Sequence, residues 1–215
     1  LKGYFGNSPT EFVKKMYPDY PWKAYKFKNT KLNYWKKESG NWPDYFKDLC
    51  NHHHWLDNNG EPDRDKLYSG ISRQKIMDFH GTSLLKHTTP IKFVKEMCPD
   101  LELKDYKFSN CPNHWWKERA NKEEYFKDLC EKERWVNPED YYKITADKMR
   151  QFYGMTLLEK HYTGSPQDFV KDMCKFDWKF YRWENVAKKD WQDKDNQLKW
   201  MDDYCKSQGI DLHGG

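Results

Sequence analysis

The chain repeats one pattern three times, and this repetition limits its fold more than any other feature. Phe12–Met16 returns 81 residues later as Phe93–Met97, and returns again after 76 more as Phe169–Met173. A second motif ends in cysteine and follows in the same order in every copy: Tyr45–Cys50, Tyr125–Cys130 and, more loosely, Trp200–Cys205. Copies in a fixed order indicate a tandem array of one unit. Arrays more often spread binding over similar sites than concentrate chemistry in one.

Polar segments that carry proline separate the copies. Asp57–Asp65 contains Pro62 and Asn137–Asp140 contains Pro138, a composition typical of connections. We therefore predict three units, spanning residues 1–65, 66–139 and 140–215. Counting back from Pro9 and Pro166 places Leu1 opposite Leu158, so the first unit lacks the first helix of the others. We expect this chain to be a fragment of a longer array.

Capping signals predict that each unit is mainly α-helical. A hydroxyl residue followed by proline opens the Phe-Val segment in every copy, at Ser8, Thr89 and Ser165, which is the usual start of a helix. The apolar residues that follow recur at helical spacing. Earlier helices are predicted to begin at Ser72 and Thr145 and to stop at Gly81 and Gly154, because glycine commonly ends a helix. The fold class is thus an array of three similar small helical units.

The second half of each unit is rich in aromatic residues. The motif Tyr-(Lys/Arg)-(Phe/Trp) occurs at Tyr25–Phe27, Tyr106–Phe108 and Tyr181–Trp183, and we expect a short extended piece with both rings on one side. A tryptophan follows, and then a last helix, which in the second copy covers about Lys122–Glu133. Aromatic residues are 18% of the chain, with 11 tryptophans, and they bury enough area to hold small units together.

The charge distribution and the cysteines limit the possible binding partners and the cellular compartment. The net charge is +4, but residues 11–37 contain eight lysines and two acids, a basic patch that either follows phosphates or is an ordinary solvated surface. The six cysteines form no CxxC motif, and five of them share equivalent repeat positions. Equivalent cysteines in separate units do not pair easily, so we predict free thiols in an intracellular, reducing compartment. No apolar run approaches the ~20 residues of a membrane span.

The run of helices from Ile144 to Met173 resembles the small helix-turn-helix repeats that accompany some homing endonucleases. Gly164–Pro166 and the bulky pair Phe169-Val170 carry this resemblance. The whole unit also resembles Trp-rich tandem repeats of predicted protist, fungal and giant-virus proteins of unknown function. The first resemblance implies that the last helix of the trio enters the major groove of DNA. The exposed side chains that would make contact are Lys14, Lys15, Lys92, Lys95, Gln167 and Lys171. The alternative is a structural three-helix module with a lysine-rich outer face.

The aromatic motif supplies a second candidate surface. Lys26, Lys107 and Arg182 each lie between two aromatic residues, and aromatics interleaved with bases can stack on unpaired nucleobases. The alternative is that both rings belong to the core of every unit.

Two clusters suggest metal binding, but comparison between copies argues against both. His52–His54 corresponds to Lys132–Arg134, and Cys111 and His114 have no Cys or His counterparts in the first copy, whereas a structural metal should recur in every unit.

The sequence also lacks a phosphate loop, HExxH and GxSxG. It predicts no enzymatic activity, cofactor or metal. We expect a protein that binds DNA or RNA, or alternatively a structural subunit that binds protein neighbours in a large assembly.

Overall fold

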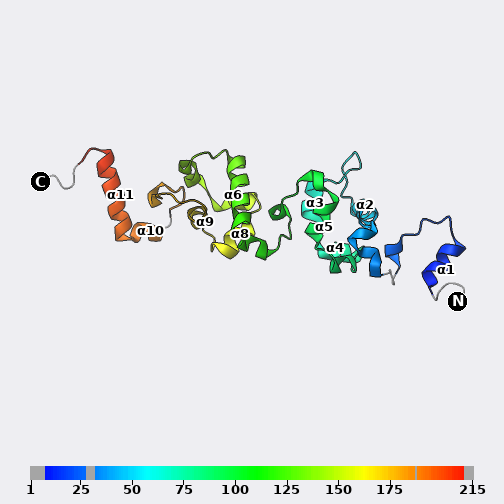
Figure 1. Ribbon diagram of the computed structural model, residues 1–215. Helices are drawn as coiled ribbons and strands as arrows, with labels where there is room; N and C mark the ends of the chain where they lie inside the picture. Colours follow the sequence, from blue (N-terminus) through cyan, green and yellow to red (C-terminus); the bar gives the residue numbers. More distant parts are fainter. Residues whose placement is uncertain (1–7, 28–31, 187, 211–215) are drawn as a thin grey trace. The chain divides into compact units, whose positions relative to one another are not determined.

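The computed structural model describes residues 8–27, 32–186 and 188–210, and these residues form a mainly α-helical protein (Figure 1). This confirms the predicted helical class. Within these ranges there is no β-strand, and one isolated bridge joins Leu56 to Pro62. The chain divides into two compact units, one ending at Cys111 and one beginning at Pro112. None of the helices in the described part of the chain combines the length and apolar character needed to cross a membrane.

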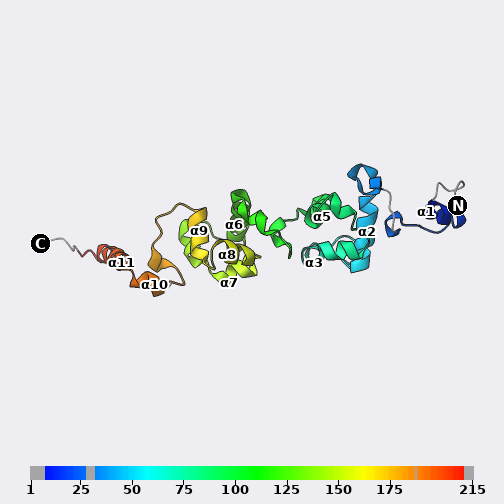
Figure 2. The ribbon, with the colours of Figure 1, turned by 90° about the horizontal axis from the view of Figure 1, so that it is seen from below.

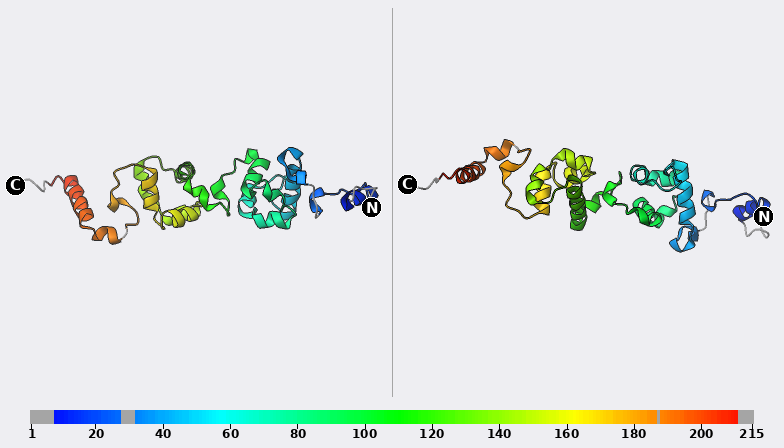
Figure 3. Two further views of the ribbon diagram at one scale, coloured as in Figure 1. Left: turned by 60° about the horizontal axis from the view of Figure 1, so that its bottom comes forward. Right: turned by 90° about the horizontal axis from the view of Figure 1, so that it is seen from above.

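Unit 1 is built around its longest helix. Its α-helices are α1 (Pro9–Met16), α2 (Trp42–His53), α3 (Arg64–Gly70), α4 (Arg73–Asp78) and α5 (Pro90–Met97). Short 3-10 turns join them: η1 (Ala24–Lys26), η2 (Leu32–Trp35), η3 (Lys37–Ser39), η4 (Leu84–Lys86), η5 (Pro99–Leu101) and η6 (Asp105–Lys107). The apolar stripe of α2 is buried against α3, α4 and α5, and Figure 3 shows these helices gathered around it. Phe93 of α5 lies edge-on to Phe46 of α2, with ring centroids 5.6 Å apart.

Unit 2 has the same kind of core around α6. Its α-helices are α6 (Arg119–Glu133), α7 (Ala146–Gln151), α8 (Met155–His161), α9 (Pro166–Met173), α10 (Lys188–Gln192) and α11 (Lys194–Ser207). Its 3-10 turns are η7 (Asn113–Lys117), η8 (Pro138–Lys143) and η9 (Phe180–Arg182). Figure 2 shows α7, α8 and α9 beside α6. Phe169 of α9 lies edge-on to Phe126 of α6, with centroids again 5.6 Å apart.

The cores do not follow the predicted unit boundaries. The boundary predicted between residues 65 and 66 falls inside α3, and the one between 139 and 140 falls inside η8. Each core joins the last helix of one predicted copy, α2 or α6, to the first helices of the next. The physical reason is that α2 and α6 carry a full apolar stripe, which the elements that follow them in the chain cover.

The predicted helix starts are confirmed in detail. The side chains of Ser8, Thr89 and Ser165 each accept a hydrogen bond from the backbone N–H three residues later, at 3.2, 3.3 and 3.2 Å. Ser72 and Thr145 cap α4 and α7 in the same way. These bonds satisfy donors that a helix start would otherwise leave unpaired.

The expected role of Gly81 and Gly154 is wrong, because neither residue has the left-handed backbone of a helix-ending glycine. His80 and Tyr153 adopt it instead, with φ of 64° and 63°. Glycine is needed one residue later for close packing, since a Cβ on Gly81 would overlap the Tyr45 hydroxyl and the Ile76 side chain. The Ile76 carbonyl accepts from both the Gly81 N–H at 2.8 Å and the Tyr45 hydroxyl at 3.1 Å.

The cysteines agree with the sequence. Cys50, Cys130 and Cys205 are buried, and all six cysteines are free. Burial raises the pKa of the Cys50 and Cys130 thiols to about 12, so both are neutral hydrophobic groups at neutral pH.

The prediction of a buried Phe-Val helix holds for two copies and fails for the first. Phe93 and Phe169 are 0% exposed, whereas Phe12 is only half-buried and no residue of α1 is buried. The reason is that α2 covers Phe93 and α6 covers Phe169, while among the described residues no such helix precedes α1.

Gly81→Ala should destabilise unit 1 by about 1–3 kcal/mol, the usual cost of forcing extra volume into a packed core. Tyr45→Phe removes the hydroxyl that the new Cβ would overlap, so the double variant should cost less than the two single variants added together. Chemical denaturation of the four proteins measures this difference. Additive costs would show that the hydroxyl and the glycine do not share one space.

Phe93→Ala and Phe169→Ala should each lower the free energy of unfolding by about 3–5 kcal/mol, because each leaves a cavity beneath a packed helix. Phe12→Ala should cost less than about 1 kcal/mol, because its ring is already partly in solvent. Urea unfolding monitored by circular dichroism compares the three. Equal losses would mean that α1 is packed as tightly as α5 and α9.

Candidate binding groove beside helix α9

The structure places most of the predicted contact lysines at the surface of their helices. Lys15, Lys92 and Lys171 are exposed on their helices, and Lys14 is half-buried. Lys95 is exposed but forms an ion pair with Asp105 of η6, which brings the outer face of α5 beside the turn that carries Lys107. Two lysines of the basic segment, at positions 28 and 31, lie outside the described residues, as does Leu1.

The aromatic motif is not extended, contrary to the prediction. It forms the 3-10 turns η1, η6 and η9, each ending one residue before the second aromatic. Tyr25, Tyr106, Phe108 and Trp183 are buried in the core, while Phe27 and Tyr181 are partly exposed. A turn is favoured because it directs the first tyrosine onto the last helix. The Tyr25 hydroxyl donates to Asp48 and the Tyr181 hydroxyl donates to Asp203, both at 2.7 Å.

The basic residue inside this motif therefore has few free aromatic neighbours. Lys26 is exposed, whereas Lys107 is half-buried, with its ammonium group 6.0 Å from the Tyr106 ring. Arg182 pairs with Glu139 at 2.5 Å and lies over the Tyr142 ring at 4.8 Å. Most rings of this motif are not available to stack on nucleobases.

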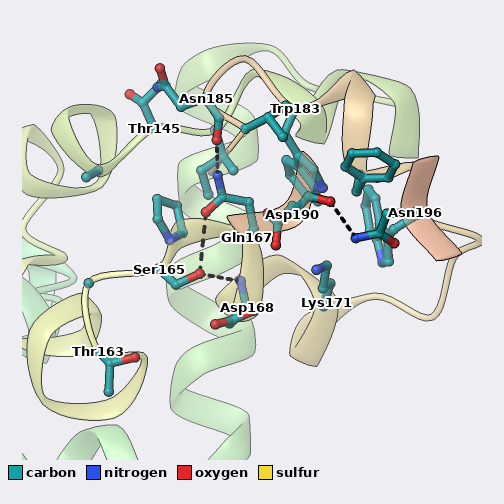
Figure 4. Close-up of a pocket in the computed structure, with 17 residues that line it drawn as sticks. Thr145, Thr163, Ser165, Gln167, Asp168, Lys171, Trp183, Asn185, Asp190 and Asn196 are labelled. Atoms are coloured by element: carbon teal, nitrogen blue, oxygen red, sulfur yellow. Dashed lines mark hydrogen bonds between the residues drawn. The ribbon is translucent and has the colours of Figure 1, made fainter. Parts of the chain in front are cut away.

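A groove of about 710 Å³ at the start of α9 brings two of the predicted residues together (Figure 4). Gln167 and Lys171 line it, and the other side chains come from the stretches 144–146, 163–168 and 178–196. Three of its aromatic residues are Trp178, Phe180 and Trp183. The groove thus combines ring faces, amide groups and one lysine within unit 2.

The cap of α9 fixes the polar wall of the groove. The Ser165 hydroxyl accepts from the Asp168 N–H, and the Gln167 side-chain amide donates to the Asn185 carbonyl at 3.0 Å. Asn196 donates to the Asp190 carbonyl at 3.0 Å on the opposite side. The Gln167 bond ties the start of α9 to the segment after η9, and the Asn196 bond ties the start of α11 to α10.

The aromatic wall is stacked and partly accessible. Trp178 and Trp183 stack with centroids 5.1 Å apart at 28°. Trp178 and Phe180 are half-buried, while Trp183 is buried. The indole N–H of Trp183 is buried and has no hydrogen-bond partner among the described residues. Because Asp168 and Asp190 accompany Lys171 in the lining, stacking and hydrogen bonding would contribute more to binding than net charge.

An acidic residue holds α9 in place. Asp172 accepts a hydrogen bond from the Tyr162 hydroxyl and lies 3.5 Å from Lys122 and 3.4 Å from Arg119. The Tyr162 hydrogen bond, together with the charges of Lys122 and Arg119, lowers the pKa of Asp172 below its usual value. Burial and the same hydrogen bond raise the pKa of Tyr162. The helix that presents Gln167 and Lys171 is thus tied to α6 and α8.

Sequence reasoning missed Trp178, Phe180, Asn185 and Asn196 as groove residues. Trp178 occupies the position that the buried Leu103 has in the second copy. This difference between the two copies is the sequence signal that could have identified Trp178. Asn196 could not be distinguished by comparing the copies, because each copy has an asparagine at this position. Asn41, Asn121 and Asn196 all donate to a backbone carbonyl beside the tryptophan of their own copy.

The histidine cluster lies at the end of α2. His52 stacks on Phe79 and His53 stacks on Trp55, with centroids 4.7 Å apart in both pairs. In the described part of the chain no three His, Cys, Asp or Glu residues are grouped closely enough to hold a metal ion.

Asp172→Asn should make the stability of unit 2 less sensitive to acid. A carboxylate with a lowered folded-state pKa contributes stability that is complete above its unfolded pKa of about 4 and is lost as the pH falls through the folded value. Thermal unfolding from neutral pH down to about pH 3 should show a shallower decline for this variant. The exposed Asp202→Asn on α11 is the control, and an identical decline in wild type and Asp172→Asn would contradict the assignment.

No family model matches this chain, and neither does a curated protein or a solved structure. The resemblance to helix-turn-helix repeats therefore stays a prediction.

Proposed function

We propose that the chain is a tandem array of three copies of one helical unit and that it binds unpaired nucleic acid, RNA or single-stranded DNA, in the groove beside α9. The observation that carries the binding proposal is the composition of that groove. Partly exposed aromatic faces, amide groups and a lysine line one cavity of about 710 Å³. Proteins that bind single strands use this combination of stacking surfaces and cationic contacts.

Matching contacts in all three copies support the array. The capped Phe-Val helices begin alike at Ser8, Thr89 and Ser165. In each copy the tryptophan lies edge-on to the first aromatic residue of the motif that ends in cysteine on the last helix. The centroid distances are 4.9 Å for Trp35–Tyr45, 5.3 Å for Trp116–Tyr125 and 6.0 Å for Trp191–Trp200.

Each part of the groove has a role in binding a nucleotide. A base would stack on Trp178 or Phe180, because every base has a π face and stacking requires no particular sequence. The amides of Gln167 and Asn185 present donors and acceptors to base edges. Lys171 supplies a cation for a phosphate.

The outer face of α9 favours single strands over a DNA major groove. Asp168 is exposed on that helix beside Lys171, and its carboxylate repels the phosphates that frame a groove. The exposed Lys15 and Lys92 belong to unit 1 and would support further copies of the site. Free thiols at all six cysteines support an intracellular, reducing compartment.

A different observation favours the second candidate, a structural subunit of an assembly. Leu198, Met201 and Tyr204 are exposed along α11, and contiguous apolar residues on a surface mark protein contacts.

Trp178→Ala should weaken binding to a single-stranded oligonucleotide by about tenfold or more, since stacking contributes about 1–3 kcal/mol per base. Lys171→Gln should weaken binding less and should flatten the dependence of log affinity on log salt by about 0.7, the value for one phosphate contact on a single strand. Fluorescence anisotropy with labelled oligo-U, oligo-dT and a duplex measures the affinities of the wild type and of both variants.

Lys160→Gln, at an exposed position on α8, is the matched control and should leave affinity unchanged. Circular dichroism confirms that each variant is folded. The proposal fails if the wild-type chain binds no single strand in a salt-sensitive manner, or if it prefers the duplex and Trp178→Ala has no effect.

A further inference from the structure

A second groove lies within unit 1, where it is bordered by η3, the start of α2 and α5. Its volume is about 580 Å³, which is within the range of pockets that hold small molecules. The side chains that line it are three exposed lysines, Lys36, Lys37 and Lys92, together with Glu38, Trp42, His87 and Glu96. Three ammonium groups against two carboxylates make the groove cationic, which favours an anionic ligand.

One wall of this groove is a fixed aromatic ring. Trp42 is 4% exposed and lies edge-on to Phe93, with ring centroids 5.5 Å apart. Its indole N–H donates to the Trp35 carbonyl at 3.0 Å. Both contacts hold the ring from inside the unit, so this wall is formed before any ligand arrives.

The carboxylate of Glu96 has an unused capacity to accept a hydrogen bond. Its Oε2 atom is shielded from solvent and accepts no hydrogen bond within the described residues. The Lys37 ammonium group forms an ion pair with this atom at 3.3 Å, without the alignment of a hydrogen bond. A buried acceptor that lacks a donor costs free energy. A ligand that donates to Glu96 would recover that cost.

Unit 2 satisfies the equivalent carboxylate from within. Asp172 has the position on α9 that Glu96 has on α5. The Tyr162 hydroxyl donates to Asp172, and the Lys122 ammonium group lies 3.5 Å from it. Unit 1 has a lysine at the position of Tyr162, and it has Trp42 at the position of Lys122. The internal donors are therefore replaced in unit 1, where an open groove lies beside the carboxylate.

We propose that this groove binds a ribose 3′-phosphate, which RNA and free nucleotides both contain. Lys36, Lys37 and Lys92 bind the phosphate through charge-assisted hydrogen bonds. Glu96 accepts a hydrogen bond from the 2′-hydroxyl, the group that distinguishes RNA from DNA. Lys37 and Glu96 form an ion pair, and in a ribose 3′-phosphate the hydroxyl and the phosphate are on neighbouring carbons. A 5′-phosphate is separated from that hydroxyl by most of the sugar, so it fits the pair less well.

This site is separate from the one proposed above. It belongs to unit 1, whereas the groove beside α9 belongs to unit 2. Its polar groups contact sugar and phosphate, so the ligand is selected by its backbone and not by its base. Either site can fail in an experiment while the other holds.

NMR titration of the isotopically labelled chain locates the site and measures its affinity. Uridine 3′-monophosphate should shift the backbone amides that border the groove, in residues 36–42 and 87–96. Its 2′-deoxy analogue should bind at least about tenfold more weakly, because it lacks a hydrogen bond to a charged group. Uridine 5′-monophosphate and inorganic phosphate should also bind more weakly than the 3′-monophosphate.

Two variants separate the roles of carboxylate and lysine. Glu96→Gln should remove the preference for ribose without weakening the deoxy analogue, because it deletes a negative charge near the phosphate. Lys92→Gln should weaken both nucleotides by a similar factor. Lys47→Gln and Asp100→Asn, at exposed positions of unit 1 outside this groove, are the matched controls and should bind like wild type. Circular dichroism confirms that all four variants are folded.

Oligo-U and oligo-dT distinguish the two sources of the ligand. Shifts of the same amides with oligo-U and not with oligo-dT assign the site to RNA, whereas binding of the mononucleotide alone assigns it to a free nucleotide. Trp178→Ala, which tests the groove beside α9, should leave the mononucleotide titration unchanged.

Four results would overturn the proposal. They are equal affinities for the ribose and deoxy forms, inorganic phosphate binding as tightly as the nucleotide, a ribose preference that survives Glu96→Gln, and shifts confined to residues outside this groove.

Discussion

The contact between a Phe-Val helix and the last helix before it determines the rest of this structure. Phe93 against Phe46 and Phe169 against Phe126 have the same centroid distance and the same edge-on angle of 85°. An edge-on aromatic pair adds directional preference to the area that it buries. Once this pair is fixed, the intervening helices fill the space between α2 and α5, or between α6 and α9, and the capped helix starts set where each element begins.

Tyrosine hydroxyls connect these cores to the backbone. Tyr45 and Tyr125 donate to carbonyls at the ends of α4 and α7, and Tyr68 and Tyr142 accept from the backbone N–H of Lys104 and Lys179. Such bonds satisfy buried backbone groups where irregular segments meet helices. These bonds hold the 3-10 turns in defined positions, although the units have little regular structure outside their helices. One of these turns is η9, which borders the groove beside α9.

Sequence alone could predict the helices but not their partners. The caps at Ser8, Thr89 and Ser165 are local signals, so the sequence predicts them without knowledge of the tertiary structure. The 3-10 form of Tyr25–Phe27 and the packing role of Gly81 depend on residues far away in the chain, which no local pattern contains. Gln167 and Lys171, which the helix pattern predicts as exposed, line the candidate groove, whereas Trp178 and Phe180 become groove residues only when η9 folds beside α9.

In the array proposed above, each core is made by the end of one copy and the beginning of the next, so the segment that a duplication would copy differs from the folded unit. A duplication of any segment one period long, wherever it starts, adds one last helix and one Phe-Val helix in the correct order, and thus one complete core. A deletion of one period removes a core equally cleanly. Arrays of this kind can therefore gain or lose copies through unequal recombination at almost any position without leaving a half-formed interior.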